Sequence, residues 1–112
     1  MKLWIDDVRP APNMYLWLKS VDEAKECIEF LERQLERIST TELRQQSQNN
    51  ITLIDLDHDA GDFAIFGGDY IKLLDWLEET GRNYPIRIHS QNVVGRMNME
   101  AICRRNGWKI VK

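Results

Sequence analysis

Short apolar segments alternate with amphipathic segments of helical periodicity along this chain, and this alternation constrains the fold more than any other feature. Strands that alternate with helices indicate a mainly parallel sheet, because each connection must return to the same end of the sheet. With 112 residues, the chain has room for one hydrophobic core. We therefore expect a single α/β domain over residues 1–112 with a mainly parallel, five-stranded sheet. The expected strands are residues 3–5, 15–18, 51–56, 86–88 and 108–111.

About three main helices are expected from the spacing of apolar residues. Residues 20–38 open with a Ser-x-x-Glu capping box and repeat apolar side chains at spacings of three and four. Residues 69–81 and 94–105 follow the third and fourth strands, and a glycine terminates each of them. The central strand, residues 51–56, is expected to have helices on both faces. Residues 39–50 are polar and without periodicity, so we expect frayed helix or a surface linker there and assign it no function.

Composition and charge exclude several classes of protein. Apolar residues make up 43% of the chain and charged residues 29%, which is the balance of a folded globular protein rather than a disordered one. The net charge of −3 disfavours extended nucleic-acid binding, which needs a dense basic surface, but leaves a nucleic-acid end open as a substrate. No apolar run approaches the roughly 18–20 residues of a membrane span. Asp6 and Asp7 interrupt the segment where a secretory signal would be apolar, so we expect a cytoplasmic protein.

The two cysteines are not expected to form a site. Cys27 and Cys103 lie far apart in the sequence, each among helix-forming residues. We interpret them as reduced, half-buried thiols rather than as a disulfide or a metal-binding pair.

Polar residues that can bind a metal or an anion follow three of the expected strands. Asp6 and Asp7 follow the first strand, residues 57–59 (Asp-His-Asp) follow the third, and His89 and Ser90 follow the fourth. In open α/β sheets, ligands bind beyond the carboxyl ends of the strands. Parallel strands would therefore bring these three clusters to one edge of the sheet.

Carboxylates that converge in this way must be neutralised. Two unit charges ~4 Å apart at an effective dielectric near 20 repel each other by about 4 kcal/mol, so the group binds a cation, takes up protons or lies apart. Oxygen donors without a thiolate favour Mg²⁺, with Mn²⁺ or Ca²⁺ as alternatives, and the histidines leave Fe²⁺ or Zn²⁺ as weaker candidates. We set aside Asp55, which lies inside a strand and could face a helix or join the pocket. The candidate metal ligands are Asp6, Asp7, Asp57 and Asp59.

The segment after the fourth strand indicates anion binding. Asn92 precedes a helix start, where free amides and the helix dipole attract phosphate. Gly95 permits close backbone approach, and the planar guanidinium of Arg96 suits phosphate oxygens. Arg9, beside the acidic pair, could bind phosphate likewise or merely neutralise the acids. We add Ser90 to these candidate phosphate-binding residues.

Each of these residues also has a purely structural interpretation. Asp6 and Asp7 precede a proline-rich loop and could be turn residues. Asp57 and Asp59 could cap a turn, and His89 could be a half-buried histidine with satisfied hydrogen bonds. The occurrence of all three clusters at strand ends favours a functional site over these alternatives.

Three motifs resemble those of a known family. The acidic pair after strand one, the aspartate after strand three and the hydroxyl after strand four are similar to the response-regulator receiver fold. The match is closer to the cyclic-phosphate processing receiver-like domains, which are derived from that fold. Their motifs read approximately Leu-Trp-x-Asp-Asp-x-Arg, Leu-Asp-His-Asp-x-Gly and Ile-His-Ser-x-Asn-x-Val-Gly-Arg-x-Asn-Met. Here these occupy residues 3–9, 56–61 and 88–99, so the resemblance covers nearly the whole chain.

The resemblance implies a three-layer, receiver-like (flavodoxin-like) fold with its site at the strand ends. It also implies action on cyclic phosphates, such as nucleotide second messengers or RNA ends, in prokaryotic defence or repair. This sequence departs from the pattern in four places. Val93 replaces a usual proline, the loop of residues 60–68 is apolar in its middle, and residues 8–14 leave little room for a first helix. The lysine that ends strand five of phosphate-accepting receivers has no clear counterpart.

Three functional hypotheses follow. In the least specific one, the pocket is vestigial and the domain only mediates interactions. In the first, the domain is a metal-dependent phosphoesterase that opens a cyclic phosphate, with Asp57 on the metal and His58 or His89 as general acid or base. In the second, a non-catalytic receiver accepts phosphate on Asp57, or senses a phosphorylated ligand, and signals through a protein partner. The missing lysine and the two histidines favour the enzyme.

Overall fold

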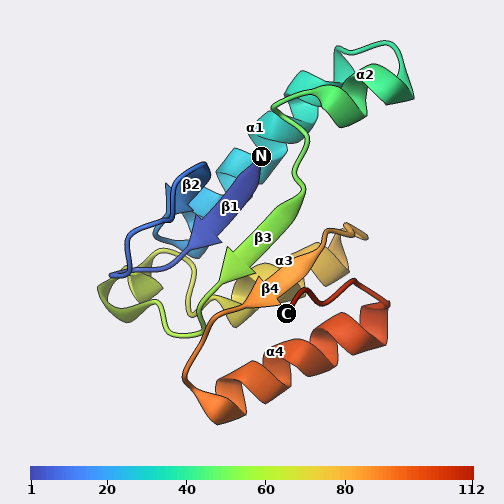
Figure 1. Cartoon of the computed structure of the whole chain (residues 1–112). Coiled ribbons are helices and arrows are strands. Elements are labelled where there is room, and N and C mark those ends of the chain that lie inside the picture. Colours follow the sequence, from blue (N-terminus) through green and yellow to red (C-terminus); the bar gives the residue numbers. More distant parts are fainter.

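The computed structural model describes residues 1–112, and a four-stranded sheet lies at its centre (Figure 1). All three strand pairings are parallel, which confirms the expected α/β class. The strand order is β2-β1-β3-β4, as in a receiver sheet that lacks its last strand. The strands are β1 (Lys2–Ile5), β2 (Tyr15–Leu18), β3 (Leu53–Leu56) and β4 (Ile86–Ile88).

The expected fifth strand is wrong. Residues 108–111 form only an isolated parallel bridge between Ile110 and Ile86. The amide of Trp108 still bonds to the carbonyl of Cys103 in the turn that ends the last helix, so pairing with β4 cannot begin before Lys109. The segment makes only two backbone hydrogen bonds with β4: the amide of Ile86 donates to the carbonyl of Lys109, and the carbonyl of Ile86 accepts the amide of Val111.

The three main helices that the apolar spacing predicts are confirmed. They are α1 (Val21–Glu36), α3 (Ile71–Glu79) and α4 (Val93–Asn106). A short helix, α2 (Thr41–Gln46), lies in the polar segment and buries no residue, and a 3₁₀ helix, η1 (Gly61–Ile65), follows β3. No helix combines the length and the apolar composition that crossing a membrane requires.

The predicted capping box starts α1, with one change of partner. The Ser20 side chain accepts the amide of Glu23 at 3.0 Å, as expected. The Glu23 carboxylate reaches back to the amide of Lys19, at 2.9 Å, rather than to that of Ser20. The first bond satisfies an amide of the first helical turn, and the second satisfies an amide of the segment that leads into the helix.

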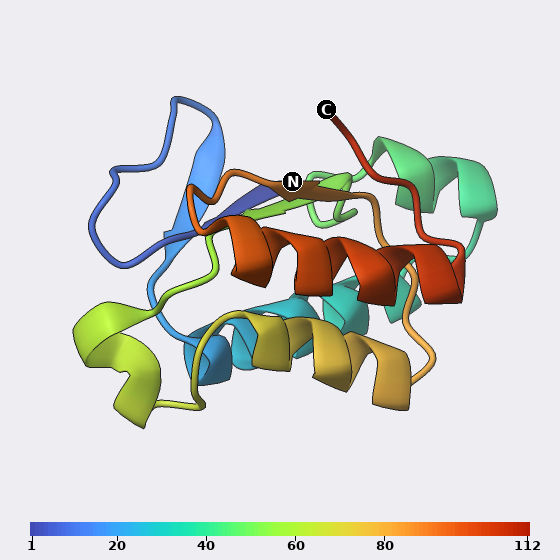
Figure 2. The ribbon, with the colours of Figure 1, turned by 90° about the horizontal axis from the view of Figure 1, so that it is seen from below.

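The expected three-layer arrangement is also wrong, because α1, α3 and α4 lie on one side of the sheet (Figure 2). Right-handed crossovers that advance in the same direction across a sheet put their helices on the same face. The connections β2-α1-β3 and β3-α3-β4 advance in the same direction. The β1–β2 connection runs the other way and would place a helix on the opposite face, but it is a loop with two prolines. The protein therefore has two main layers and one hydrophobic core between them.

The sheet face opposite the helices is covered by side chains rather than by helices. Trp4 leaves only 8% of its surface exposed there, and its ring meets Tyr15 edge to face at 5.9 Å between centroids. Leu53 is equally buried on this face, and the Lys2 ammonium lies 5.4 Å from the Tyr15 ring centroid. Asp55 and Arg87 pair across β3 and β4 on the same face.

Both cysteines are free thiols as expected, but Cys103 is fully buried rather than half-buried. Cys103 packs in the core, where burial, reinforced by the charge of Glu100, raises the pKa of its thiol to about 11. Cys27 is half-buried, and burial also raises the pKa of its thiol. Neither thiol is set up as a nucleophile or a metal ligand, since both functions need the thiolate.

Candidate functional site

Three aspartates meet at the carboxyl ends of β1 and β3. Asp6, Asp7 and Asp57 can each offer one carboxylate oxygen such that all these oxygens lie within 4.8 Å of one another. Oxygens that share a divalent cation at roughly 2.0–2.6 Å each are separated by at most about 5 Å. The spacing therefore fits a hard cation such as Mg²⁺, Mn²⁺ or Ca²⁺, as the donor set predicts. We call these three residues the acidic triad.

Asp6 is the fully buried member of the acidic triad. One of its oxygens, Oδ1, accepts the backbone amides of Val8 and Arg9 at 3.0 and 2.9 Å. Burial by itself would raise the pKa of the Asp6 carboxyl, but the bonds from Arg9, His89 and Val8 outweigh it and hold the pKa below its usual value. Asp6 is therefore a fixed anionic oxygen donor.

Asp7 is shifted in the opposite direction. Burial, and then the charges of Asp6 and Asp57, raise the pKa of its carboxyl above the usual value. Its side chain lies against Gly61, where a Cβ would come within 2.3 Å of the Asp7 Oδ2 atom. Gly61 also has a φ of 55°, so both the close contact and the backbone conformation favour glycine at this position. The repulsion inside the acidic triad is the kind that a bound cation relieves.

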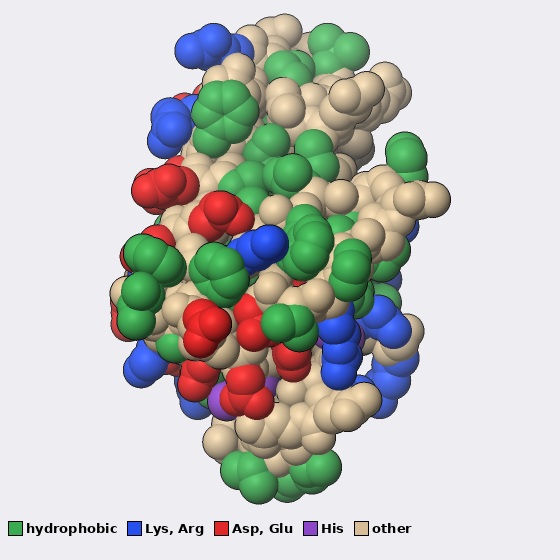
Figure 3. Space-filling view, turned by 90° about the vertical axis from the view of Figure 1, so that its left-hand side faces the viewer, with side chains coloured by type: hydrophobic (Ala, Val, Ile, Leu, Met, Phe, Trp, Pro, Cys, Tyr) green, Lys and Arg blue, Asp and Glu red, His purple; other side chains and the backbone are tan.

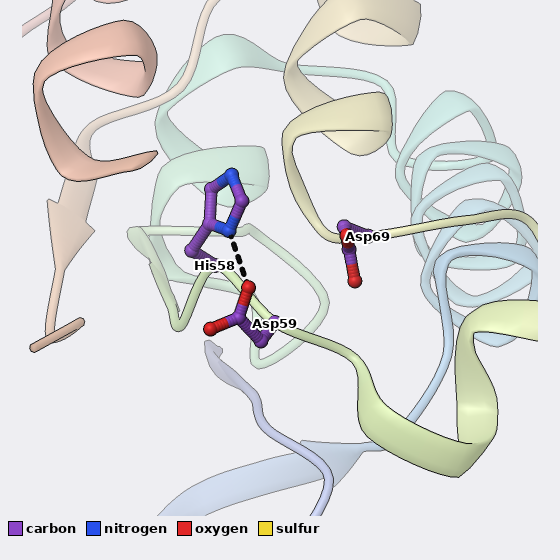
Figure 4. Close-up of side chains that lie close together, drawn as sticks. All are labelled: His58, Asp59 and Asp69. Carbon is purple, nitrogen blue, oxygen red and sulfur yellow. Dashed lines mark hydrogen bonds and ion pairs between the residues drawn. The ribbon is translucent and has the colours of Figure 1, made fainter. Parts of the chain in front are cut away.

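Asp59, a fourth candidate ligand, belongs to a separate group. His58, Asp59 and Asp69 form a second set of side chains whose donor atoms lie within 4.8 Å of one another (Figure 4). The His58 Nδ1 atom is 2.7 Å from Asp59 Oδ1, and Asp69 Oδ1 accepts the amide of Ala60. The structure thus places Asp59 beside His58 rather than in the acidic triad.

His58 packs against the first turn of α4. A Cβ at Gly95 would lie 2.5 Å from ring atoms of His58, so only glycine lets the ring approach this closely. The side chain of His58 is 16% exposed, and its Nε2 atom makes no hydrogen bond to the protein. Its Nδ1 atom is held by Asp59. Of the two histidines, His58 is the one that keeps a ring nitrogen free of hydrogen bonds to the protein.

His89, the other candidate acid or base, is enclosed on all sides. Its Nε2 lies 2.8 Å from Asp6 Oδ2, and its Nδ1 lies 2.7 Å from Asp55 Oδ1. Its ring stacks on Trp4 with centroids 3.8 Å apart and an angle of 3° between the planes. The side chain is only 7% exposed. With both ring nitrogens occupied, His89 is placed to hold carboxylates rather than to meet a substrate.

Asp55 is the residue that sequence reasoning set aside although the structure brings it next to the site. It is fully buried, and its second oxygen accepts the Arg87 guanidinium at 2.9 Å. A signal was present in the sequence, because a carboxylate inside a buried strand needs a partner. Arg87 in the next strand is that partner, but the pairing depends on the register between β3 and β4, which cannot be read from the sequence.

The candidate phosphate-binding residues divide into two sets. Asn92 caps α4 by accepting the amide of Gly95 at 2.9 Å, and the buried Ser90 accepts the amide of Asn92 at 3.0 Å. Arg96 pairs with Glu100 one turn later along α4. Arg9 is tied to the site, because its guanidinium donates to the carbonyl of His89 at 3.1 Å. Arg9 is therefore the cation whose contacts place it beside the acidic triad.

The surface above the strand ends combines charge of both signs. Figure 3 shows the left-hand side of the Figure 1 view: acidic side chains gather over its left and lower parts with histidine among them, and cationic side chains lie at the lower right, at the left edge and near the centre. Apolar side chains border the acidic area above and below. This distribution suits a ligand that is anionic and is bound through a cation.

One family model matches the chain: the cyclic-phosphate processing receiver domain, over residues 1–105. No curated protein and no solved structure gave a significant match. The match covers β1 to α4, and it therefore includes the acidic triad, both histidines and Arg9. It agrees with the parallel sheet, its strand order and the acidic group at its carboxyl edge. The chain therefore belongs to the family of cyclic-phosphate processing receiver domains.

Proposed function

We propose that this domain is a divalent-metal-dependent phosphoesterase that opens a cyclic phosphate, either in a cyclic nucleotide or at a 2′,3′-cyclic phosphate RNA end. The observation that carries the proposal is the convergence of Asp6, Asp7 and Asp57, whose donor oxygens lie within 4.8 Å. Family membership supports the cyclic phosphate as the substrate. We further propose a cytoplasmic location and a phosphate-bearing small molecule or nucleic-acid end as the binding partner, without extended nucleic-acid contacts.

Mg²⁺ is the metal that the donor set suits best, since all three candidate ligands are carboxylates. When bound, such a cation polarises a phosphoryl oxygen and favours the hydroxide form of a coordinated water. The protein's part is to hold the three oxygens in place. Asp6 does so from a buried position, and the pKa of Asp7 is raised by burial and then by the charges of Asp6 and Asp57, a repulsion that a bound cation would relieve.

The remaining chemistry falls to Arg9 and His58. Arg9 lies beside the acidic triad, and its guanidinium would bind phosphoryl oxygens. In ring opening, a water oxygen would bond to phosphorus and release a proton to solvent, while one phosphorus–oxygen ester bond breaks. His58 Nε2 would supply the proton that the departing alkoxide needs, while Asp59 holds Nδ1 and sets the ring orientation.

Hydrolysis of 2′,3′- and 3′,5′-cyclic nucleotides with Mg²⁺ or Mn²⁺ tests this proposal. We expect turnover in the wild type and a loss of at least ~100-fold in His58→Ala, the lower end of what general acid–base catalysis contributes. Asp57→Asn should be equally impaired, because it removes the negative charge of one triad carboxylate. Asp75→Asn, an acid-to-amide change on α3 whose only ion pair is a long contact with Lys72, is the matched control and should keep wild-type activity. No turnover, or turnover that the two site variants leave intact, contradicts the proposal.

A second candidate function is favoured by the position of Asp57. This partly exposed aspartate follows β3 within an acidic triad, as the phosphate-accepting aspartate of a receiver would. A signalling module would form an acyl phosphate there and pass the signal to a protein partner. Intact-mass measurement after exposure to acetyl phosphate separates the two, because a phosphate adduct that is absent in Asp57→Asn would support the receiver function.

A further inference from the structure

A line of four charged or titratable side chains runs from the sheet face opposite the helices into the acidic triad. Arg87 contacts Asp55, Asp55 contacts His89, and His89 contacts Asp6, with distances of 2.9, 2.7 and 2.8 Å. Both carboxylates are fully buried and His89 is nearly so. Burying charged groups lowers the stability of the fold unless each is paired, and here every one of the four side chains has a partner.

The hydrogen bonds of Asp6 leave one place for a cation. A carboxylate has two oxygens with about four acceptor positions in all. The amides of Val8 and Arg9 occupy both positions of Oδ1, and His89 occupies one position of Oδ2. The remaining position of Oδ2 is the one that can bind a metal. Asp6 is therefore restricted to binding through one oxygen in a fixed direction.

His89 can impose this restriction only if its own ring is fixed. Stacking on Trp4 sets the plane of the ring, and Asp55 sets its rotation within that plane by binding Nδ1. Arg87 holds the other oxygen of Asp55. Asp55 therefore fixes the direction in which the Nε2 atom of His89 faces Asp6.

We infer that Asp55 is a positioning residue for the metal centre. Through His89, and with the help of Arg87, it fixes the single oxygen that Asp6 presents to the cation. The inference rests on the metal site of the proposed function and is independent of any phosphate chemistry. Groups that orient metal ligands typically contribute 10–100-fold to metal affinity.

Titration calorimetry of Mn²⁺ into the metal-free protein tests the inference with Asp55→Asn. This variant keeps the shape of the side chain and removes its charge. We expect its Mn²⁺ affinity to fall by about 10-fold or more. The matched control is Glu32→Gln, the same chemical change in an ion pair with Arg82, between α1 and the loop after α3. The control should bind Mn²⁺ with wild-type affinity.

Two further measurements separate positioning from a general loss of structure. Long-range ¹H–¹⁵N spectra of the His89 ring should change in Asp55→Asn and match the wild type in Glu32→Gln. Arg87→Met, whose parent side chain is 42% exposed, should fold even if Asp55→Asn does not, and should weaken Mn²⁺ binding in the same direction.

Unchanged Mn²⁺ affinity in folded Asp55→Asn would overturn the inference. If Asp55→Asn does not fold, unchanged affinity in Arg87→Met would overturn it instead. A wild type that binds no divalent cation would also overturn it. A wild type that binds Mn²⁺ with the predicted dependence on Asp55 but hydrolyses no cyclic phosphate would support the inference and remove the enzymatic proposal. The two failures are therefore distinguishable.

Discussion

Neighbouring aspartates in this protein have pKa values that move in opposite directions, and their hydrogen bonds explain the difference. Asp6 is the more deeply buried, yet its pKa is lowered, because two amides and His89 donate to it against the effect of burial. The pKa of Asp7 is raised, first by burial and then by the charges of Asp6 and Asp57. Asp6 is thus stabilised as an anion by the protein itself, whereas Asp7 needs a partner that the chain does not provide.

Asp7→Asn should therefore stabilise the metal-free protein at neutral pH. A carboxyl whose pKa is higher in the folded state than in the unfolded chain costs stability once the pH exceeds the unfolded value, and costs nothing below it. The gain in melting temperature should be present at pH 7 and disappear as the pH falls below about 4, where both states are protonated. Thermal melts with a chelator across this range measure it. A variant that is less stable than the wild type at pH 7 would contradict the assignment.

At the scale of the elements, the first turn of α4 is shaped by its contact with His58. Asn92 caps the helix, and Gly95 leaves the space that the imidazole ring fills. Glycine in a helix lowers helix stability by up to about 1 kcal/mol relative to alanine. At this position the lower helix stability accompanies the close approach of the His58 ring. The contact joins the strand end that carries Asp57 to the helix that follows β4.

The contact between Gly95 and His58 can be tested by a double-mutant cycle. Gly95→Ala should destabilise the wild type and reduce its activity, since the new methyl group would displace the ring. In a His58→Ala background, the same change should be neutral or stabilising by up to about 1 kcal/mol, because the clash is gone and alanine favours the helix. Chemical denaturation of the four proteins gives the coupling. Equal effects of Gly95→Ala in both backgrounds would show that the ring does not lie there.

Local patterns in the sequence predicted the elements better than their arrangement. Apolar spacing located four strands and three helices, and the polar residues after the strands predicted the acidic triad. The buried pairing of His89 with Asp55 was missed because it depends on the register between β3 and β4. The layering was mispredicted because it depends on which way each connection advances across the sheet, and the one connection that runs backwards contains no helix.

For the whole molecule, the arrangement is a sheet with helices on one side and a site at its edge. The core between sheet and helices fixes the strands, and the opposite face carries Trp4, Asp55 and Arg87, which reach the site through His89. Both faces of the sheet therefore contribute to the position of the acidic triad. Cation binding should stabilise the entire fold, because the ligands come together only when β1 and β3 are paired.

Thermal unfolding of the wild type and of Asp57→Asn with increasing Mn²⁺ tests the metal centre most directly. A cation that binds only the folded protein adds about 2.7 kcal/mol to the free energy of unfolding at 100 times its dissociation constant. We predict a wild-type melting temperature that rises with Mn²⁺ concentration and a response in Asp57→Asn that is much smaller at the same concentrations. A wild-type melting temperature that does not change with divalent cations would contradict a metal centre at Asp6, Asp7 and Asp57. An equal rise of the melting temperature in both proteins would contradict it as well.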